Sequence, residues 1–320
     1  GVRPGVTFCH ANRVAAASVP GPTAGSASLP RRRATDPGRM DNSGADLATL
    51  LGRARRRLAG LPAGRLEAEV LLAHVLGVNR AWLFAHPDQE IPAGKATAFA
   101  RFLARRERGE PLAYLTGTRE FWSLALHVTH DVLIPRPETE LLVETALGHI
   151  PDDANWRIAD LGTGCGAVAI AIATERPQCE VHATDRSAAA LRIAGINADA
   201  LAPGRVQLHL GSWLEPLEGR FEVIGSNPPY VAEGDPHLLE GDCRFEPRDA
   251  LTPGTDAMAA IRHIAEHALP CLGPGGLLAF EHGFDQGEPA RRLLFELGYG
   301  DVSTARDLEG RERVSSGLRT

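Results

Sequence analysis

The segment GSNPPYV, residues 225–231, directly follows the apolar run FEVI and combines an asparagine, two prolines and a tyrosine. Pro228 and Pro229 fix two φ angles and remove two backbone N–H donors, so the segment is stiff and rich in hydrogen-bond acceptors. We expect it to bind a planar group with N–H donors, against the Asn227 side chain and the Tyr230 ring. Taken alone, it is equally typical of a proline-rich end to a strand.

A second cluster lies in ADLGTGCGAVAIAIA, where Gly162, Gly164 and Gly166 separate a strand-like run from a helical one. Glycines let the backbone turn tightly and approach a ligand, and the N-terminus of the following helix presents free N–H groups. Asp185 ends the next predicted strand, where a carboxylate can accept both hydroxyls of a ribose. NAD would explain these two features as well, but no hydride-transfer pocket is obvious in the sequence.

After residue 155 the chain alternates strand-like and helical segments. The predicted strands cover 156–162, 180–185, 206–211, 221–226 and 275–283, with a long helix near 257–271 and a final helix from 287. This alternation predicts an α/β domain over residues 136–320, with a doubly wound, mostly parallel sheet and helices on both faces.

Apolar residues recur at helical spacing from 45 to 109 and predict three amphipathic helices, at 45–60, 65–77 and 93–109. We expect them to form a small helical domain over residues 40–110. The connecting segment, 111–135, switches to a strand-like pattern and predicts a β-hairpin with Gly117 in a turn.

Residues 1–39 are rich in Ala, Pro, Ser, Gly and Arg and show no sustained apolar period, so we expect them to be disordered. An Arg-rich, acid-poor leader is typical of a mitochondrial transit peptide. An extended start upstream of Met40 is the alternative that we favour.

The net charge of −6 argues against generic binding to nucleic acids. Five scattered cysteines without a CxxC pair indicate reduced thiols and no metal site. No stretch approaches the roughly 18 apolar residues that a membrane span requires. We therefore expect a cytoplasmic monomer with no metal, no membrane partner and no stable nucleic-acid partner.

The motifs DLGTGCG, TDRS and NPPYV, in this order, resemble those of the class I S-adenosylmethionine-dependent methyltransferases of amino and amide nitrogen. AYLTGTREFWSL, LIPRPETELLVE, FEPRDAL, LGPGGLLAFEHG and GRERV narrow the resemblance to the bacterial peptide chain release factor glutamine-N5 methyltransferases, over residues 45–317. The most specific of these is IPRPETE. Two positions depart from the family pattern: Ala257 replaces a usual glycine, and Arg186 replaces a usual apolar residue.

The resemblance implies S-adenosyl-L-methionine as the cofactor and assigns a role to each motif. The methionine end would lie against the loop of Gly162, Thr163, Gly164, Cys165 and Gly166, with the ribose on Asp185. Trp213 would contact the adenosine, although an ordinary packed aromatic explains it too. Asn227, Pro228 and Tyr230 would form the catalytic set and, with Pro229, bind the substrate. Asn227 would lie between cofactor and substrate and bind the cofactor as well. The roles of Arg136, Glu138 and His282 stay open, with packing favoured for His282.

The implied reaction is methylation of N5 of the glutamine in the Gly-Gly-Gln motif of peptide chain release factors. An amide nitrogen is a poor nucleophile, so the Asn227 oxygen and the Pro228 carbonyl would accept its two N–H bonds and orient it, while Tyr230 packs on the amide. The helical domain would recognise the release factor. The alternatives are an amino-methyltransferase of nucleic-acid bases, a ribosomal-protein glutamine methyltransferase, and a non-catalytic binding protein.

Overall fold

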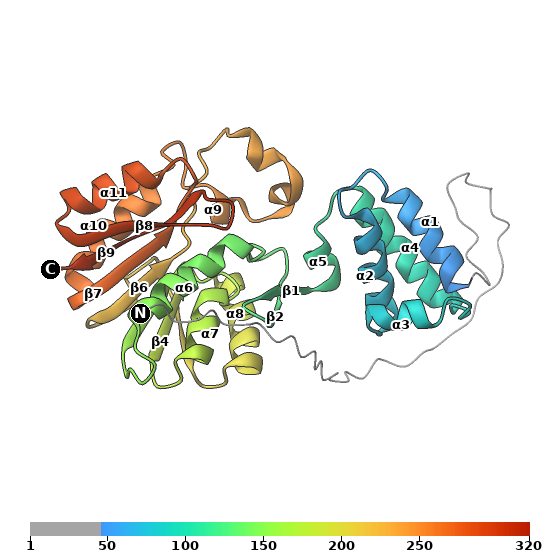
Figure 1. Ribbon diagram of the computed structural model, residues 1–320, viewed down its shortest axis with the longest axis horizontal. Helices are drawn as coiled ribbons and strands as arrows, with labels where there is room; N and C mark the ends of the chain where they lie inside the picture. Colours follow the sequence, from blue (N-terminus) through green and yellow to red (C-terminus); the bar gives the residue numbers. More distant parts are fainter. Residues whose placement is uncertain (1–45) are drawn as a thin grey trace, which may run out of the picture. The chain divides into compact units, whose positions relative to one another are not determined.

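The computed structural model describes residues 46–320, drawn in colour in Figure 1. The predictions made for residues 1–39 lie outside this part of the chain. Within the described part, no helix combines the length and apolar character needed to cross a membrane.

Five helices occupy the first part of the described chain: α1 (Leu47–Arg57), α2 (Gly64–Leu76), α3 (Arg80–Ala85), α4 (Ala93–Glu107) and α5 (Leu112–Thr116). α1, α2 and α4 match the three predicted helices and bury a common core that includes Leu50, Leu72 and Phe99. α3 was not predicted, because six residues are too few to show a helical period. Its one sequence signal is Asn79, whose side chain accepts a hydrogen bond from the Trp82 N–H at 2.9 Å and caps the helix.

The predicted hairpin is present, and Gly117 lies in a turn as predicted, but this turn ends α5 rather than joining the two hairpin strands. Gly117 ends α5 with a φ of 74°, and the hairpin strands are β1 (Thr118–Phe121) and β2 (Leu124–His127). The turn lies at Trp122 and Ser123, which have φ angles of 53° and 59°. Such a two-residue turn favours Asn and Gly, so sequence reasoning did not place it here. A tertiary contact supports it: the Trp122 N–H donates to Glu140 Oε1 at 2.8 Å.

The main sheet has seven strands: β3 (Arg157–Leu161), β4 (Glu180–Asp185), β5 (Val206–Leu210), β6 (Phe221–Ser226), β7 (Leu272–Glu281), β8 (Tyr299–Arg306) and β9 (Glu312–Arg319). They lie in the order β5-β4-β3-β6-β7-β9-β8. β3 to β7 run parallel, and β9 pairs antiparallel with both β7 and β8. The predicted mostly parallel, doubly wound sheet is confirmed, but its last two strands were missed.

Helices cover both faces of this sheet (Figure 1). One face carries α6 (Glu140–His149), α7 (Ala167–Glu175) and α8 (Ala188–Leu201), and the other carries α10 (Ala259–Cys271) and α11 (Gly287–Glu296). Adjacent residues of β3 show the division, since Ile158 belongs to the first core and Ala159 to the second. Short helical turns complete the chain: η1 (Pro137–Thr139), η2 (Pro236–Leu239), η3 (Gly241–Phe245) and α9 (Arg248–Leu251).

The strand order reverses at β3, which pairs with β4 on one side and with β6 on the other. In a doubly wound sheet, ligands bind outside the carboxyl ends of the strands at such a reversal. The glycine-rich loop follows β3 and NPPYV follows β6. The topology therefore brings these two motifs together at one edge of the sheet.

Candidate functional site

The loop between β3 and α7 depends on glycine. Gly162, Gly164 and Gly166 have φ angles of 71°, 57° and 88°, a region that other residues rarely adopt. A Cβ atom built at Gly162 would lie 3.2 Å from the Trp213 ring, tighter than most such contacts. Trp213 thus lies against the loop, with a positive φ of its own, 49°.

The two other loop residues, Thr163 and Cys165, are buried and do not line the neighbouring cavity. The Thr163 hydroxyl donates to Asp160 Oδ2 at 2.6 Å, and the same oxygen accepts from the Ala169 N–H at 3.2 Å. Burial raises the pKa of Asp160 to about 6. Burial also raises the pKa of the Cys165 thiol to about 12, so this side chain stays protonated at neutral pH. Asp160, which the sequence analysis did not single out, therefore holds the loop to the start of α7 through these two hydrogen bonds.

Asp185 lies at the end of β4 and joins the loop to the start of α8. Its Oδ2 accepts from the Gly164 N–H at 2.9 Å, and its Oδ1 accepts from the Ser187 N–H at 2.8 Å. A carboxylate has about four acceptor positions, so both oxygens keep capacity for a ligand. A cavity of about 1130 Å³ opens beside it, with Gly162, Gly164, Asp185, Trp213, Asn227 and Pro229 among its lining residues.

Arg186, the departure from the family pattern, lines the same cavity and forms a 3.0 Å ion pair with Asp249. Both side chains are well exposed, so this pair contributes little to stability.

NPPYV is divided between the cavity and the protein interior. Asn227 and Pro229 line the cavity, whereas Pro228 is buried and Tyr230 is partly buried. The Tyr230 backbone carbonyl accepts from Gln286 Nε2 at 3.1 Å, which fixes the end of the segment. No donor from residues 46–320 reaches the Pro228 carbonyl or Asn227 Oδ1. Of the two expected acceptor residues, the cavity is lined by Asn227 and not by Pro228.

Two residues that sequence reasoning missed hold the polar side chains of this segment. Asn227 Nδ2 donates to Thr139 Oγ1 at 3.0 Å, and the Thr139 hydroxyl donates to Glu281 Oε2 at 2.6 Å. The Tyr230 hydroxyl donates to the other oxygen, Glu281 Oε1, at 3.0 Å. Burial raises the pKa of Glu281, which is 1 % exposed. The only sequence signal was a carboxylate closing an apolar strand.

The segment IPRPETE is tied to the wall of the cavity. Arg136 forms an ion pair with Glu246, whose Oε1 also accepts from the Ile134 N–H at 3.1 Å. Pro247, the residue after Glu246, lines the cavity. The Glu138 side chain has no hydrogen-bond or ion-pair partner among the residues that the structure describes.

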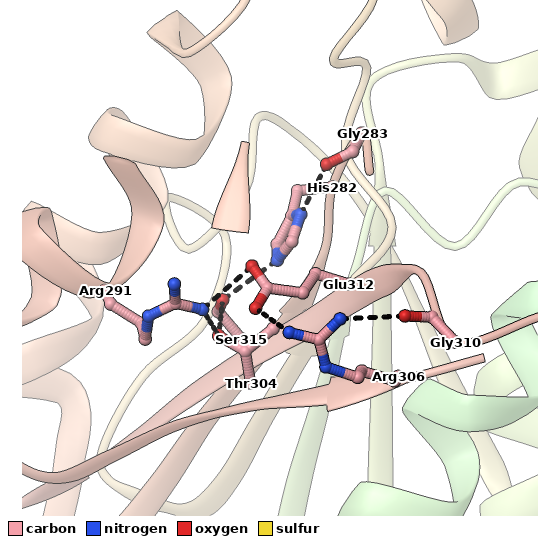
Figure 2. Close-up of polar contacts among 8 residues, drawn as sticks. All are labelled: His282, Gly283, Arg291, Thr304, Arg306, Gly310, Glu312 and Ser315. Carbon is pink, nitrogen blue, oxygen red and sulfur yellow. Dashed lines mark hydrogen bonds and ion pairs between the residues drawn. The ribbon is translucent and has the colours of Figure 1, made fainter. Parts of the chain in front are cut away.

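His282, fully buried, belongs to a different hydrogen-bonded chain, drawn in Figure 2. Its Nδ1 lies 2.8 Å from the Gly283 carbonyl and must donate, so Nε2 accepts from Ser315 Oγ at 2.9 Å. Ser315 in turn accepts from Thr304 at 2.8 Å, and Thr304 accepts from Arg291 at 2.8 Å. Burial lowers the pKa of His282, which keeps the ring neutral. These contacts join the two residues that follow β7 to β8, β9 and α11, and none of them reaches the cavity.

Two family models match the chain: PrmC N-terminal domain over residues 49–117 and Methyltransferase small domain over residues 137–240. The release factor glutamine methyltransferase of Xylella fastidiosa (strain Temecula1) is 51% identical over 254 residues, covering 79% of this chain and 92% of that protein. Its namesake in Bordetella pertussis is 51% identical over 260 residues, covering 81% and 95%. The one in Escherichia coli (strain K12) is 46% identical over 254 residues, covering 79% and 91%.

Proposed function

Because the chain belongs to the release factor glutamine methyltransferase family, we propose that it methylates the side-chain amide nitrogen (N5) of the glutamine in the Gly-Gly-Gln motif of peptide chain release factors. The observation that carries this proposal is the meeting of the glycine-rich loop and NPPYV in one cavity. The loop, Asp185 and Trp213 form one side of that cavity, and the free acceptors of Asn227 and Pro228 lie on the other motif.

The donor side of the cavity fits S-adenosylmethionine. Gly162 and Trp213 both line the cavity, and a side chain at Gly162 would crowd the Trp213 ring, so glycine backbone and an aromatic ring lie side by side there. Asp185 keeps acceptor capacity for the ribose hydroxyls. When bound, the cofactor supplies an activated methyl group on a sulfonium. We assign its binding to Gly162, Gly164, Asp185 and Trp213, with Thr163, Cys165 and Gly166 shaping the loop.

The acceptor side of the cavity orients the substrate amide. The Asn227 oxygen and the Pro228 carbonyl accept the two N–H bonds of the glutamine, while Pro229 and the Tyr230 ring pack against the flat amide. Holding two reactants in line can supply roughly 7–11 kcal/mol of the barrier. One amide proton must leave as the new N–C bond forms. We assign it to water, since Thr139 separates the carboxylate of Glu281 from Asn227.

Substrate recognition is assigned to the helical domain over residues 40–110, joined by residues 111–135 to the catalytic domain over residues 136–320. The separate match of residues 49–117 to the PrmC N-terminal domain supports this division. We further propose that the enzyme acts as a cytoplasmic monomer without a stable nucleic-acid partner. The net charge of −6 supports the last point.

The test is a partition of label between two kinds of substrate. The protein is incubated with methyl-labelled S-adenosylmethionine and either a purified release factor or bulk RNA and DNA, with Asn227→Ala as the inactive control. Label should enter the release factor alone, and only with the unaltered protein. Label in the nucleic acid, or in neither, would contradict the proposal.

A further inference from the structure

Glu281 is a buried carboxylate that the proposed reaction does not use. It ends β7 beneath NPPYV, it is 1 % exposed, and its partners among residues 46–320 are two hydroxyl groups rather than a cation. An ionised carboxylate in such a place costs stability, and an apolar or amide side chain would fold more easily there. Its position therefore calls for an explanation other than stability.

When Glu281 is ionised, the hydrogen bonds around it have only one consistent direction. An ionised carboxylate only accepts, so the Thr139 hydroxyl must use its single proton on Glu281 Oε2. The Thr139 oxygen can then only accept from Asn227, 3.0 Å away. The Asn227 side chain must therefore turn its NH₂ group toward Thr139 and its oxygen away.

The same carboxylate fixes the other polar side chain of the segment. The Tyr230 hydroxyl donates to Glu281 Oε1 at 3.0 Å, so both polar side chains of NPPY depend on one buried group. The Asn227 chain passes through Thr139, which belongs to η1, in the IPRPETE segment.

We propose that Glu281 and Thr139 are positioning residues that select one orientation of the Asn227 carboxamide, with its oxygen facing the substrate nitrogen. The opposite orientation would present an NH₂ group to the N–H bonds of the glutamine and repel them. This inference rests on the proposed function for its substrate. It assigns a task to two residues that touch neither substrate nor cofactor.

The first test compares three substitutions in single-turnover methyl transfer to a release factor at saturating S-adenosylmethionine. Thr139→Val removes the hydroxyl at constant shape and should slow transfer about 10- to 100-fold, as expected when a reacting group is misplaced. Thr139→Ser retains the hydroxyl and should stay within about threefold of the unaltered protein. Thr145→Val is the matched control, because the Thr145 hydroxyl bonds only to the Leu141 carbonyl within α6. A normal rate for Thr139→Val, or a rate for Thr139→Ser as low as that of Thr139→Val, would overturn the proposal.

Glu281→Gln separates positioning from folding. Gln has an NH₂ group in place of one acceptor oxygen, so either its oxygen or its NH₂ group can face Thr139, and only the first arrangement keeps the Asn227 orientation. Transfer should therefore slow by no more than in Thr139→Val, while the melting temperature stays level or rises because a buried charge is gone. S-adenosylmethionine affinity, measured by calorimetry, should not change. The transfer rate of the unaltered protein should also fall in acid at a higher pH than an ordinary glutamate would give, and Glu281→Gln should lose this limb. The charged and titratable groups facing Glu281 are Tyr230, Glu138 in η1 and Arg313 in β9.

A readout without substrate distinguishes a failure of this inference from a failure of the proposed function. The side-chain NH₂ signals of Asn227 in proton–nitrogen NMR spectra are assigned by their loss in Asn227→Asp. They should exchange slowly with solvent in the unaltered protein and faster in Thr139→Val. If no release factor is methylated, the proposed function fails and this exchange still decides the inference. Equal exchange in both proteins would contradict it.

Discussion

Glu281 and His282 are consecutive buried residues at the end of the same strand, and they serve different parts of the molecule. Glu281 bonds through hydroxyl groups to Thr139 and Tyr230, and through Thr139 to Asn227 in the cavity. His282 bonds through hydroxyl groups to Ser315 and onward to α11 (Figure 2). Consecutive side chains near a strand point to opposite sides, so one step along the chain separates the two networks.

The two networks differ in how they end. The hydrogen-bond chain through His282 is closed in the sense that both of its ends are satisfied. It begins at Arg291, which can only donate, and finishes at the Gly283 carbonyl, which accepts. The chain through Glu281 is open, because it finishes at Asn227, whose oxygen has no donor within residues 46–320. A closed chain serves the fold, and an open chain that reaches a cavity can serve a ligand. Burial alone does not distinguish Glu281 from His282, because both are buried. The end point of each hydrogen-bond chain does.

The largest effect is expected at the open end of the chain. Asn227→Ala should lower kcat about 10²–10³-fold, because it removes a preorganised acceptor from the site and leaves the His282 network untouched. Single-turnover rates at saturating cofactor measure this loss apart from cofactor binding. Asn227→Asp should rescue little, since a carboxylate favours the charged ground state of the sulfonium over the transition state. Asn155→Ala, a substitution of an exposed asparagine, is the control. A near-normal rate for Asn227→Ala would mean that NPPYV only ends the strand and does not bind the substrate amide.

Asp185→Ala should weaken cofactor binding without unfolding the protein. A hydrogen bond to a charged acceptor contributes roughly 1.5–3 kcal/mol, and Asp185 also holds the Gly164 and Ser187 N–H groups. We expect S-adenosylmethionine affinity to fall about 10- to 100-fold by calorimetry. Asp199→Ala, an exposed substitution in α8, should have no effect. Unaltered affinity in Asp185→Ala would remove the ribose assignment.

His282→Gln should affect stability and spare turnover per folded molecule. We expect a loss of about 1–3 kcal/mol in the free energy of unfolding, from a broken buried hydrogen-bond chain. A strong fall in single-turnover rate with unchanged stability would mean that His282 serves the reaction rather than the fold.

The pH dependence of stability should also distinguish His282. Burial lowers its pKa from the ordinary 6.5, so the neutral ring stabilises the fold above that pH, and the contribution is lost as pH falls through the folded value. His74 and His182 act in the same direction. The difference in acid slope between the unaltered protein and His282→Gln therefore isolates His282, and identical slopes would show that its ring does not titrate with unfolding.

Tyr230→Phe should have the smallest effect, because the ring that packs on the substrate survives and Thr139 still holds Asn227. One lost hydrogen bond of about 0.5–1.5 kcal/mol corresponds to a fall in kcat of about 2- to 13-fold at most. Tyr299→Phe is the matched control, since the Tyr299 hydroxyl bonds to the Ala265 carbonyl in the core and should affect only stability. A fall for Tyr230→Phe as large as that for Asn227→Ala would mean that the phenol itself takes part in the reaction.

Much of the cofactor side could be predicted from the sequence because its contacts are local. The glycines and Thr163 lie in one loop, and Asp185 ends the neighbouring strand. Asp160, which the sequence analysis did not single out, lies in the strand just before that loop. The substrate side could be predicted only in part. Thr139 and Glu281 are 142 positions apart, and neither residue type identifies a partner at that distance.

The failure to predict strand β9 has the same physical cause, a dependence on contacts that are distant in the sequence. β9 is buried through its middle, but there it carries Ser315, Ser316 and Gly317 rather than an apolar run. Ser315 is buried because it bonds to His282 and Thr304, so tertiary hydrogen bonds take the place of the apolar pattern that identifies a strand. The turn at Trp122 and Ser123 was missed for a similar reason, since Glu140 supports it from another element.

The most direct test of the account is tandem mass spectrometry of a release factor after reaction with the purified protein and S-adenosylmethionine. We predict one added methyl group, on the side-chain amide of the Gly-Gly-Gln glutamine, and no addition when Asn227→Ala replaces the unaltered protein under the same conditions. A methyl group on any other residue, or an equal yield from Asn227→Ala, would contradict it.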